Sequence, residues 1–153
     1  MEHKIVALLP MKANSERVKG KNFRDFNGKP LYRWILDRLL KVEQIDQVVI
    51  NTDAPAILQK SGLIENSRIL IRDRKPAICG DMVSMNLIIA DDIENVVADT
   101  FLMTHTTNPL LSIKTIQRAL TAYQKATSNG TADSLFSVNK IQTYIYLLGI
   151  ASI

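Results

Sequence analysis

Cysteine, histidine and aromatic residues are scarce in this 153-residue sequence, and their scarcity excludes several kinds of site. The single cysteine, Cys79, cannot form an internal disulfide or a multi-cysteine zinc site, and it suits a reducing compartment such as the cytoplasm. Two histidines are too few for a multi-histidine metal site, so we predict no metal ligands within this chain. Aromatic residues make up 6% of the chain and do not interleave with basic residues, so we expect no nucleic-acid partner.

Long apolar runs are also missing from the sequence. No stretch reaches the roughly 18 apolar residues of a membrane-spanning helix, and we expect no membrane partner. The first apolar run, residues 5–9, is too short for the core of a signal peptide. The length fits one domain, residues 1–153, and a hydrophobic fraction of 46% is sufficient for a real core.

The few glycines form none of the familiar phosphate-binding motifs. Gly20 and Gly28 are too far apart for the G-x-G-x-x-G of a dinucleotide-binding fold, which disfavours hydride transfer. Residues 20–22 lack the glycine spacing and the Lys-Ser/Thr pair of a Walker A loop. Ser15 lacks the G-x-S-x-G elbow of a hydrolase nucleophile, so acyl transfer is also disfavoured.

Apolar runs and amphipathic runs alternate along the chain, which predicts an α/β sandwich with a mostly parallel sheet. Continuous apolar runs are typical of strands that are buried on both faces, whereas apolar residues at a spacing of three or four predict helices. The expected strands are residues 5–9, 47–53, 68–72, 100–104 and 134–138. The expected helices cover residues 30–42, 54–60, 84–97 and 112–128, with Ser84 or Asp81 and then Ser112 as caps.

The last ten residues, 144–153, are almost uncharged and follow no amphipathic pattern. Two interpretations of this tail stay open at this point. It forms a core strand or a subunit contact, or it belongs to a chain that stops before its fold is complete.

Polar clusters follow three of the expected strands and should meet at one edge of the sheet. They are residues 11–33, rich in lysine and arginine, then residues 51–53, and then residues 105–108; the loop at 72–81 should join them. Open α/β sheets bind ligands at this edge. Cations and directional hydrogen bonds together suit a nucleoside triphosphate. A solvated basic surface is the alternative interpretation.

These polar segments resemble, in order, four signatures of the acylneuraminate cytidylyltransferases, the CMP-sialic acid synthetase family. Residues 10–23 and 27–31 are similar to its N-terminal signature, and residues 51–53 to its Ser-Thr-Asp. Arg74 with residues 79–84 resembles its next loop, and residues 104–110 resemble its Gln-Pro-Thr-Ser-Pro-Leu. The resemblance extends from about residue 5 to residue 138.

The resemblance implies a Rossmann-like nucleotide-diphospho-sugar transferase fold, which is a three-layer α/β/α sandwich. It implies transfer of a cytidylyl group from CTP to an eight- or nine-carbon acidic sugar, with Mg²⁺ as cofactor, release of pyrophosphate, and a possible homodimer. By resemblance, Lys21 and Lys12 steady charge on the reacting phosphates and are the catalytic residues. Lysine at position 12 replaces a family arginine, which keeps the charge and loses the fork geometry.

The other site residues implied by the resemblance bind the nucleotide or the sugar. His105 and Thr107 fall at the sugar rim. The expected nucleotide-binding residues are Lys12, Ala13, Asn14, Ser15, Lys21, Asn22, Arg74, Asp81 and Ser84. A solvated lysine is the alternative for Lys21, a satisfied strand-end histidine for His105, and helix capping for Asp53 and Asp81.

Members of this family are longer than this chain, and their second half supplies metal-binding aspartates, sugar-binding cations and a dimer arm. None of these is recognisable after Val138, so we expect a fragment, a natural truncation or a frameshift product with little turnover. Two alternatives stay open. One is another nucleotidyltransferase of this fold that acts on a different sugar or alditol phosphate, and the other is a non-catalytic module that assembles through its tail.

Overall fold

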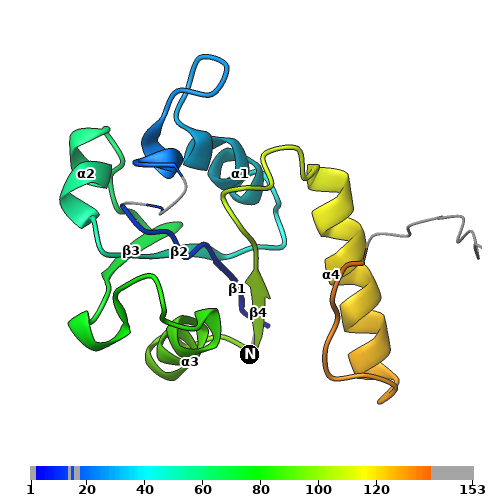
Figure 1. The fold of residues 1–153 in the computed structure, drawn as a ribbon. Helices are drawn as coiled ribbons and strands as arrows, with labels where there is room; N and C mark the ends of the chain where they lie inside the picture. Colours follow the sequence, from blue (N-terminus) through cyan, green and yellow to red (C-terminus); the bar gives the residue numbers. More distant parts are fainter. Residues whose placement is uncertain (1–2, 14, 16–17, 139–153) are drawn as a thin grey trace, which may run out of the picture. The chain divides into compact units, whose positions relative to one another are not determined.

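The computed structural model describes residues 3–13, 15 and 18–138, and the chain divides into two compact units at residue 118. The first unit holds a four-stranded sheet formed by β1 (Ile5–Leu8), β2 (Gln47–Thr52), β3 (Ile69–Asp73) and β4 (Thr100–Met103) (Figure 1). The strand order is β3-β2-β1-β4 and every pair is parallel. The predicted α/β fold with a parallel sheet is therefore confirmed.

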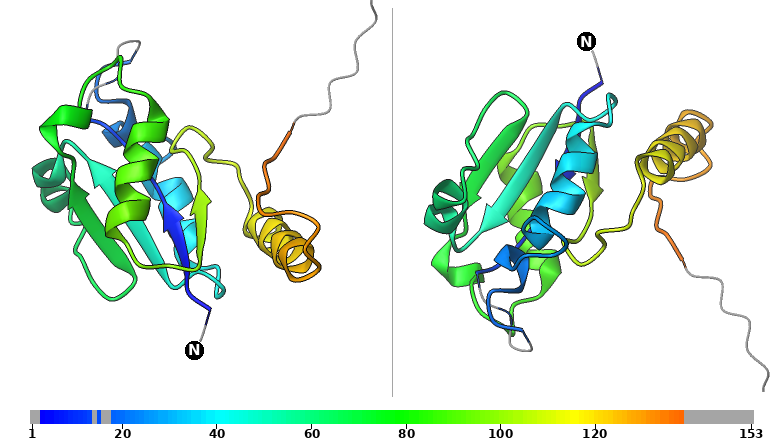
Figure 2. Two further views of the ribbon diagram at one scale, coloured as in Figure 1. Left: turned by 90° about the horizontal axis from the view of Figure 1, so that it is seen from below. Right: turned by 90° about the horizontal axis from the view of Figure 1, so that it is seen from above.

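Helices cover both faces of this sheet. Figure 2 shows α1 (Leu31–Leu40) on one face and α3 (Met85–Asn95) on the other. The short helix α2 (Pro55–Lys60) follows β2. These elements form the three layers that the resemblance implies.

The buried strand β1 lies at the centre of the core. All four of its residues are buried, as expected of a strand between two neighbours and two helix layers. Val6 and Leu8 pack with Val49 of β2 and with Ile89 and Val96 at the α3 side. Helix α1 buries the face formed by Tyr32, Ile35, Leu36 and Leu39, at a spacing of three or four residues.

Parallel pairing continues beyond the end of β1 and fixes the start of the next loop. The amide of Met11 donates to the carbonyl of Asn51 at 3.0 Å, and Met11 forms a bridge with Thr52. The chain continues the same pairing after β3 and after β4. The amide of Arg74 donates to the carbonyl of Thr52 at 2.8 Å, and the amide of Thr104 donates to the carbonyl of Leu8 at 3.1 Å. The loops after all four strands therefore begin at the same edge of the sheet.

Two short 3₁₀ helices, which the sequence pattern did not predict, lie in these loops: η1 (Lys21–Phe23) and η2 (Pro76–Ile78). Gly20 precedes η1 with a φ of 64°, a left-handed conformation that a side chain would strain. Ser84 caps α3 by accepting from the amide of Asn86 at 3.3 Å. Ser112 accepts from the amide of Thr115 at 3.1 Å, which confirms it as a cap.

Helix α4 (Ile113–Ser128) begins in the first unit and continues into the second. Within the second unit, its end is closed by Gly130, whose φ is 64° and whose amide donates to Thr127 at 3.0 Å. The predicted strand at residues 134–138 is wrong, because these residues are irregular and exposed. Phe136 is 83% exposed, and none of the described residues pairs with this segment as a strand. The tail at 144–153 lies outside the described residues.

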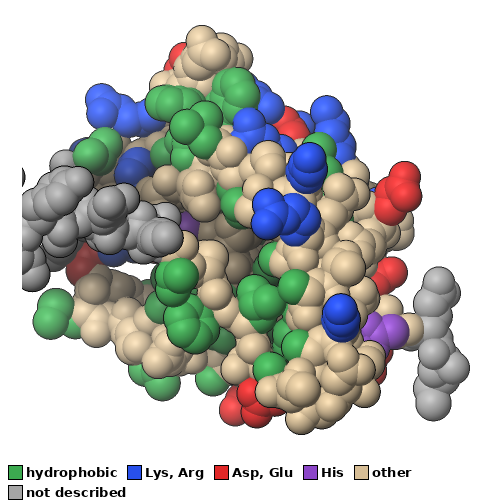
Figure 3. Space-filling view, turned by 90° about the vertical axis from the view of Figure 1, so that its right-hand side faces the viewer, with side chains coloured by type: hydrophobic (Ala, Val, Ile, Leu, Met, Phe, Trp, Pro, Cys, Tyr) green, Lys and Arg blue, Asp and Glu red, His purple; other side chains and the backbone are tan. Residues whose placement is uncertain are grey.

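Lysine and arginine side chains are exposed on the face of the molecule that Figure 3 draws. Within the part of the chain that the structure describes, no helix combines the length and the apolar character needed to cross a membrane.

Arg68 holds the end of α1 against the start of the sheet. Its Nη2 donates to the carbonyl of Leu40 at 3.2 Å and to that of Ile45 at 2.8 Å. Carbonyls at the end of a helix have no partner within the helix, so a nearby guanidinium both satisfies them and complements the helix dipole.

We expect Arg68→Met to lower the free energy of unfolding by about 1–3 kcal/mol, because carbonyls next to the core lose a charged donor. Urea unfolding followed by circular dichroism measures the change. Arg33→Met is the matched control: this arginine is 37% exposed and pairs with Asp37 one turn along α1. Such a surface pair contributes about 0.5 kcal/mol or less. Equal losses in the two variants would contradict the role assigned to Arg68.

Candidate functional site

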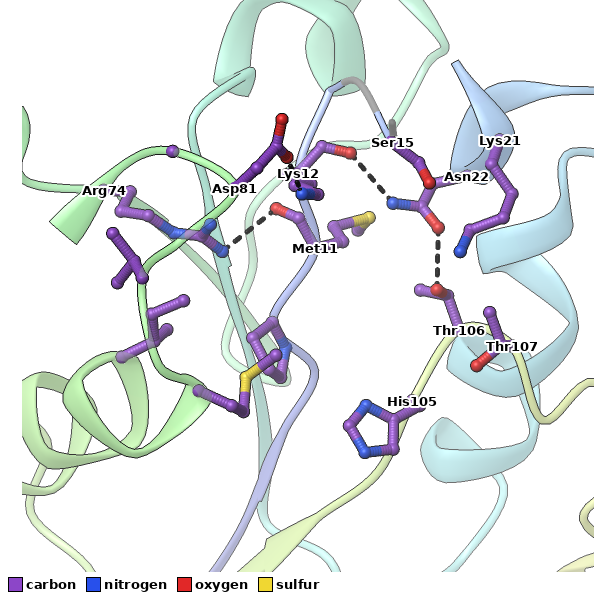
Figure 4. Close-up of a pocket in the computed structure, with 15 residues that line it drawn as sticks. Met11, Lys12, Ser15, Lys21, Asn22, Arg74, Asp81, His105, Thr106 and Thr107 are labelled. Atoms are coloured by element: carbon purple, nitrogen blue, oxygen red, sulfur yellow. Dashed lines mark hydrogen bonds and ion pairs between the residues drawn. The ribbon is translucent and has the colours of Figure 1, made fainter. Parts of the chain in front are cut away.

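A cavity of about 300 Å³ lies at the carboxyl edge of the sheet, within the first unit. The loop after β1 contributes Lys12, Ser15, Lys21 and Asn22 to its wall. The chain after β4 contributes His105 and Thr107, together with Thr106. Figure 4 shows Arg74 on one side of this space and Lys21 with Asn22 on the other. The sheet edge named from the sequence is thus where the structure has a concave site.

The cavity combines a basic end with an apolar wall. Lys12 and Lys21 supply two cations, whereas Pro10, Met85 and Ile88 supply apolar surface. Met85 and Ile88 come from the first turns of α3, so the start of this helix also faces the site. Such a division suits a ligand that is anionic at one end and apolar at the other.

Lys12 forms an ion pair with Asp81, which joins the loop after β1 to the loop before α3. The side chains are 32% and 43% exposed, so water screens the attraction and the pair is open to exchange. Asp81 therefore balances one of the two lysine charges in the absence of a ligand. An anion that enters the cavity competes with the Asp81 carboxylate for Lys12.

Asn22 is buried and its amide is oriented by two hydrogen bonds. Its Nδ2 donates to the carbonyl of Lys12 at 2.9 Å, and its Oδ1 accepts from Oγ1 of Thr106 at 2.7 Å. Thr106 is 6% exposed and connects the chain after β4 to the loop after β1. The sequence reasoning named His105 and Thr107 on either side and missed Thr106. Thr106 carries a hydroxyl and lies between two candidate residues, but its residue type alone does not set it apart. Its burial does, and burial is seen only in the structure.

Arg74 is a cavity residue with an anchored guanidinium. It is 6% exposed, and its Nε donates to Oδ1 of Asn51 at 2.8 Å. Its Nη2 donates to the carbonyls of Asn51 at 2.8 Å and Met11 at 3.2 Å. For Nη1, the described residues offer no hydrogen-bond partner. Arg74 thus fixes the loop after β1 to the end of β2, and it also lines the cavity.

Two neighbouring aspartates of α3 lie behind Arg74 and differ in their titration. A hydrogen bond from Lys75, followed by the charge of Arg72, lowers the pKa of Asp91 although burial opposes this. Burial raises the pKa of Asp92, against hydrogen bonds from Asn51 and Arg72. The sequence placed Asn51 in a polar cluster at this edge without its role and gave no signal for either aspartate, because their contacts join residues about 20 to 40 positions apart.

The other predicted site residues have different positions. Ala13 does not line the cavity; its amide donates to Oδ1 of Asp53 at 2.7 Å. This contact shows that Asp53 holds the first loop, whereas α2 has no side-chain cap. Ser84 caps α3 and does not line the cavity. Asn14 lies outside the described residues. The ligand contacts of the whole predicted set stay predictions.

The described residues contain no group of three or more histidine, cysteine, aspartate or glutamate side chains placed to hold a metal ion. Asp81 is the one carboxylate among the described residues that line the cavity. The described residues that line the cavity offer cations, an amide, hydroxyls, an imidazole, one carboxylate and apolar surface. Such a set positions a charged ligand and stabilises charge on it.

Comparison with solved structures relates this fold to nucleotidyltransferases. The structure of CMP:2-keto-3-deoxy-manno-octonic acid synthetase complexed with CTP matches with a TM-score of 0.65 and 20% identity, over 82% of this chain and 49% of that one. A 4-diphosphocytidyl-2C-methyl-D-erythritol synthase from Anaerococcus prevotii matches with a TM-score of 0.61 and 16% identity, over 80% of this chain and 52% of that one. At such identities the likeness shows the fold.

Sequence comparison relates the chain to cytidylyltransferases of acidic sugars. It is 26% identical over 131 residues to a pseudaminic acid cytidylyltransferase of Campylobacter jejuni, which covers 82% of this chain and 54% of that protein. It is 23% identical over 124 residues to a 3-deoxy-manno-octulosonate cytidylyltransferase of Christiangramia forsetii, over 81% and 47% respectively. The chain thus spans about half the length of these relatives.

A family model described as cytidylyltransferase matches residues 6–146, which is most of the sequence and includes every residue that lines the cavity. The chain therefore belongs to the cytidylyltransferase family.

Proposed function

We propose that this chain is the CTP-binding part of an enzyme that transfers a cytidylyl group to an acidic sugar and releases pyrophosphate. One observation carries the proposal: Lys12, Lys21 and Arg74 line a single cavity in a chain of the cytidylyltransferase family. The cations suit the triphosphate, and the buried arginine beside apolar surface suits the base.

The triphosphate belongs at the lysine end of the cavity in this proposal. Lys21 lines the wall beside Asn22, and Lys12 is available once its pair with Asp81 opens. Phosphate oxygens accept hydrogen bonds and carry charge, so two ammonium groups and the Ser15 hydroxyl complement them. Gly20 lets the chain turn directly before Lys21, which directs this lysine into the site.

The base belongs between Arg74 and the apolar wall that includes Met85 and Ile88. A guanidinium only donates hydrogen bonds. The O2 and N3 atoms of cytosine both accept, whereas N3 of uracil carries a hydrogen and repels a donor. The free Nη1 of Arg74 therefore favours cytosine over uracil at this wall.

The acceptor sugar belongs at the rim near His105 and Thr107, which line the cavity and are exposed. Its class is an eight- or nine-carbon acidic sugar, in line with the relatives named for pseudaminic acid and 3-deoxy-manno-octulosonate. A sialic-acid-like acceptor belongs to the same chemical class. In the reaction, the sugar hydroxyl attacks the α-phosphorus and pyrophosphate leaves.

Charge accumulates on the phosphate oxygens during this step. Lys21 and Lys12 stabilise it, and each positioned cation of this kind contributes about 2–4 kcal/mol to lowering the barrier. Bound Mg²⁺ neutralises further charge on the triphosphate. Such an ion usually takes one or two carboxylates together with phosphate oxygens and waters, so Asp81, the one carboxylate among the described residues that line the cavity, would suit an ion that arrives with CTP.

The first prediction concerns ligand choice and Lys21. We expect CTP to bind more tightly than UTP, ATP or GTP in isothermal titration calorimetry. Lys21→Ala should weaken CTP binding about tenfold, because one direct phosphate contact is lost. Lys19→Ala removes the same charge from the same loop, but Lys19 is exposed and does not line the cavity. Equal weakening in both variants would show general attraction to a basic surface and would contradict the site.

The second prediction concerns the pair between Lys12 and Asp81. Without Mg²⁺, we expect Asp81→Asn to tighten binding of CTP about threefold, because Lys12 is released and a repelling carboxylate is removed. With Mg²⁺ present, the same variant should bind CTP more weakly than the wild type, because the ion loses its carboxylate. An effect of the same sign in both titrations would contradict a role of Asp81 toward the ion.

The third prediction concerns turnover. We expect the 153-residue chain alone to bind CTP and to release little pyrophosphate when it is given Mg²⁺ with pseudaminic acid, 3-deoxy-manno-octulosonate or a sialic acid. The reason is that the resemblance implies a pair of metal-binding aspartates for the transfer, whereas the described residues that line the cavity include one carboxylate. A coupled phosphate assay with inorganic pyrophosphatase measures the product. Robust release with any of these acceptors would contradict the expectation.

A further inference from the structure

Asp92 is a buried carboxylate that does not line the cavity. It lies on α3 with 0% exposure, and its Oδ2 has no hydrogen-bond partner among the described residues. Burying a charged group is costly unless good partners compensate. Its other oxygen, Oδ1, has two hydrogen-bond partners. The role of the carboxylate is therefore to be found in the contacts of Oδ1.

Oδ1 of Asp92 connects to the cavity through one side chain. It accepts from Nδ2 of Asn51 at 2.8 Å and also from Nη1 of Arg72. Oδ1 of Asn51 in turn accepts from Nε of Arg74 at 2.8 Å. A continuous line of hydrogen bonds therefore runs from the carboxylate through the Asn51 amide to the guanidinium at the cavity wall.

The order of charges along this line fixes the orientation of the amide. A carboxylate accepts only, so the NH₂ group of Asn51 must face Asp92. A guanidinium donates only, so the oxygen of Asn51 must face Arg74. A reversed amide would place two acceptors together at one end and two donors together at the other. The Asp92 carboxylate thus selects the Asn51 conformation that accepts from Arg74.

We propose that Asp92 is a positioning residue that acts through Asn51 to hold the Arg74 guanidinium against the cavity wall and so sets the affinity of the site for cytosine. The inference rests on the proposed function, because it takes the base to be the group that Arg74 contacts. It assigns Asp92 no contact with the ligand and no role at the phosphates.

Asp91 provides a matched control on the same helix. Its Oδ2 pairs with Nη2 of Arg72 at 2.9 Å, and its Oδ1 pairs with Nζ of Lys75 at 2.5 Å. It is nearly buried and shares Arg72 with Asp92, but the structure records no bond from it to Asn51. Asp91→Asn therefore removes a neighbouring charge and leaves the line to Arg74 in place.

The experiment measures the affinities of the wild type, Asp92→Asn, Asn51→Ala, the double variant and Asp91→Asn by titration with CTP and with inorganic tripolyphosphate. We expect Asp92→Asn and Asn51→Ala each to weaken CTP binding about three- to tenfold, the cost of a misplaced hydrogen bond. Tripolyphosphate affinity should change less than twofold. The CTP affinity of the double variant should equal that of the single variant with the lower affinity, because both changes break the same line of hydrogen bonds. Asp91→Asn should bind CTP within twofold of the wild type.

A second readout follows Arg74 without any ligand. The ¹H–¹⁵N resonance of its Nε–H should shift in Asp92→Asn and in Asn51→Ala, and should stay in place in Asp91→Asn. Thermal unfolding monitors the fold, and Asn51→Ala decides the question if Asp92→Asn does not fold.

Three outcomes would overturn the assignment of Asp92: unchanged CTP affinity in Asp92→Asn, equal loss of CTP and tripolyphosphate, or the same loss in Asp91→Asn. A wild type that binds no CTP would instead overturn the proposed function. The Arg74 resonance then decides whether Asp92 positions this side chain: a shift confined to Asp92→Asn and Asn51→Ala supports it, and an unmoved resonance overturns it.

Discussion

The contacts of the Arg74 guanidinium hold the site together. Three separate segments, the chain after β1, the end of β2 and the chain after β3, meet at this one group through the carbonyl of Met11 and the carbonyl and side chain of Asn51. The carbonyl of Asn51 also accepts from the amide of Met11, so Arg74 adds a second donor to this carbonyl and donates to that of Met11 as well. A planar cation with several N–H groups reaches both carbonyls and the Asn51 side chain at once, which a lysine would not do with fixed geometry. The edge of a parallel sheet therefore becomes a rigid wall rather than a set of loose loops.

The ion pairs at the cavity differ in exposure from the ion pairs away from it. Away from the cavity, Arg72 and Lys75 pair with Asp91, and Arg72 also contacts Asp92. These pairs compensate the buried carboxylates in part, because Oδ2 of Asp92 has no hydrogen-bond partner among the described residues. At the cavity, Lys12 pairs with Asp81 at a partly exposed position, where the interaction is weak and exchangeable. Lys21 has no recorded ion pair among the described residues. Arg72, which is 16% exposed, thus pairs with buried carboxylates, whereas the cavity residue Lys12 forms a partly exposed pair that can exchange.

The sequence predicted the elements whose signal is local. Residues 5–9 and 47–53 are continuous apolar runs that end in polar residues, and the structure has strands there that lead into the cavity. Residues 134–138 gave a similar local signal but form no strand, because strand formation also needs a neighbour to complete the ladder. The basic loop could be placed near Arg74 because parallel strands end at one edge. The roles of Thr106, Asn51 and Asp92 were not accessible in this way, although the first two lie in predicted polar clusters, because each acts through burial and a partner distant in sequence.

The chain spans about half the length of its relatives and still contains a formed cavity, because the residues that line the cavity and their partners lie close together in one folded unit. The cavity walls come from segments that follow β1, β3 and β4, and all three strands pair within the first unit. Asn22 is oriented by Thr106, Arg74 by Asn51, and Lys12 by Asp81, so every orienting partner also lies within the first unit. Preorganisation of this kind needs only that each cavity residue have a partner in the same folded unit. The walls of the cavity are therefore formed within the first unit, although the described residues that line it include one carboxylate, Asp81.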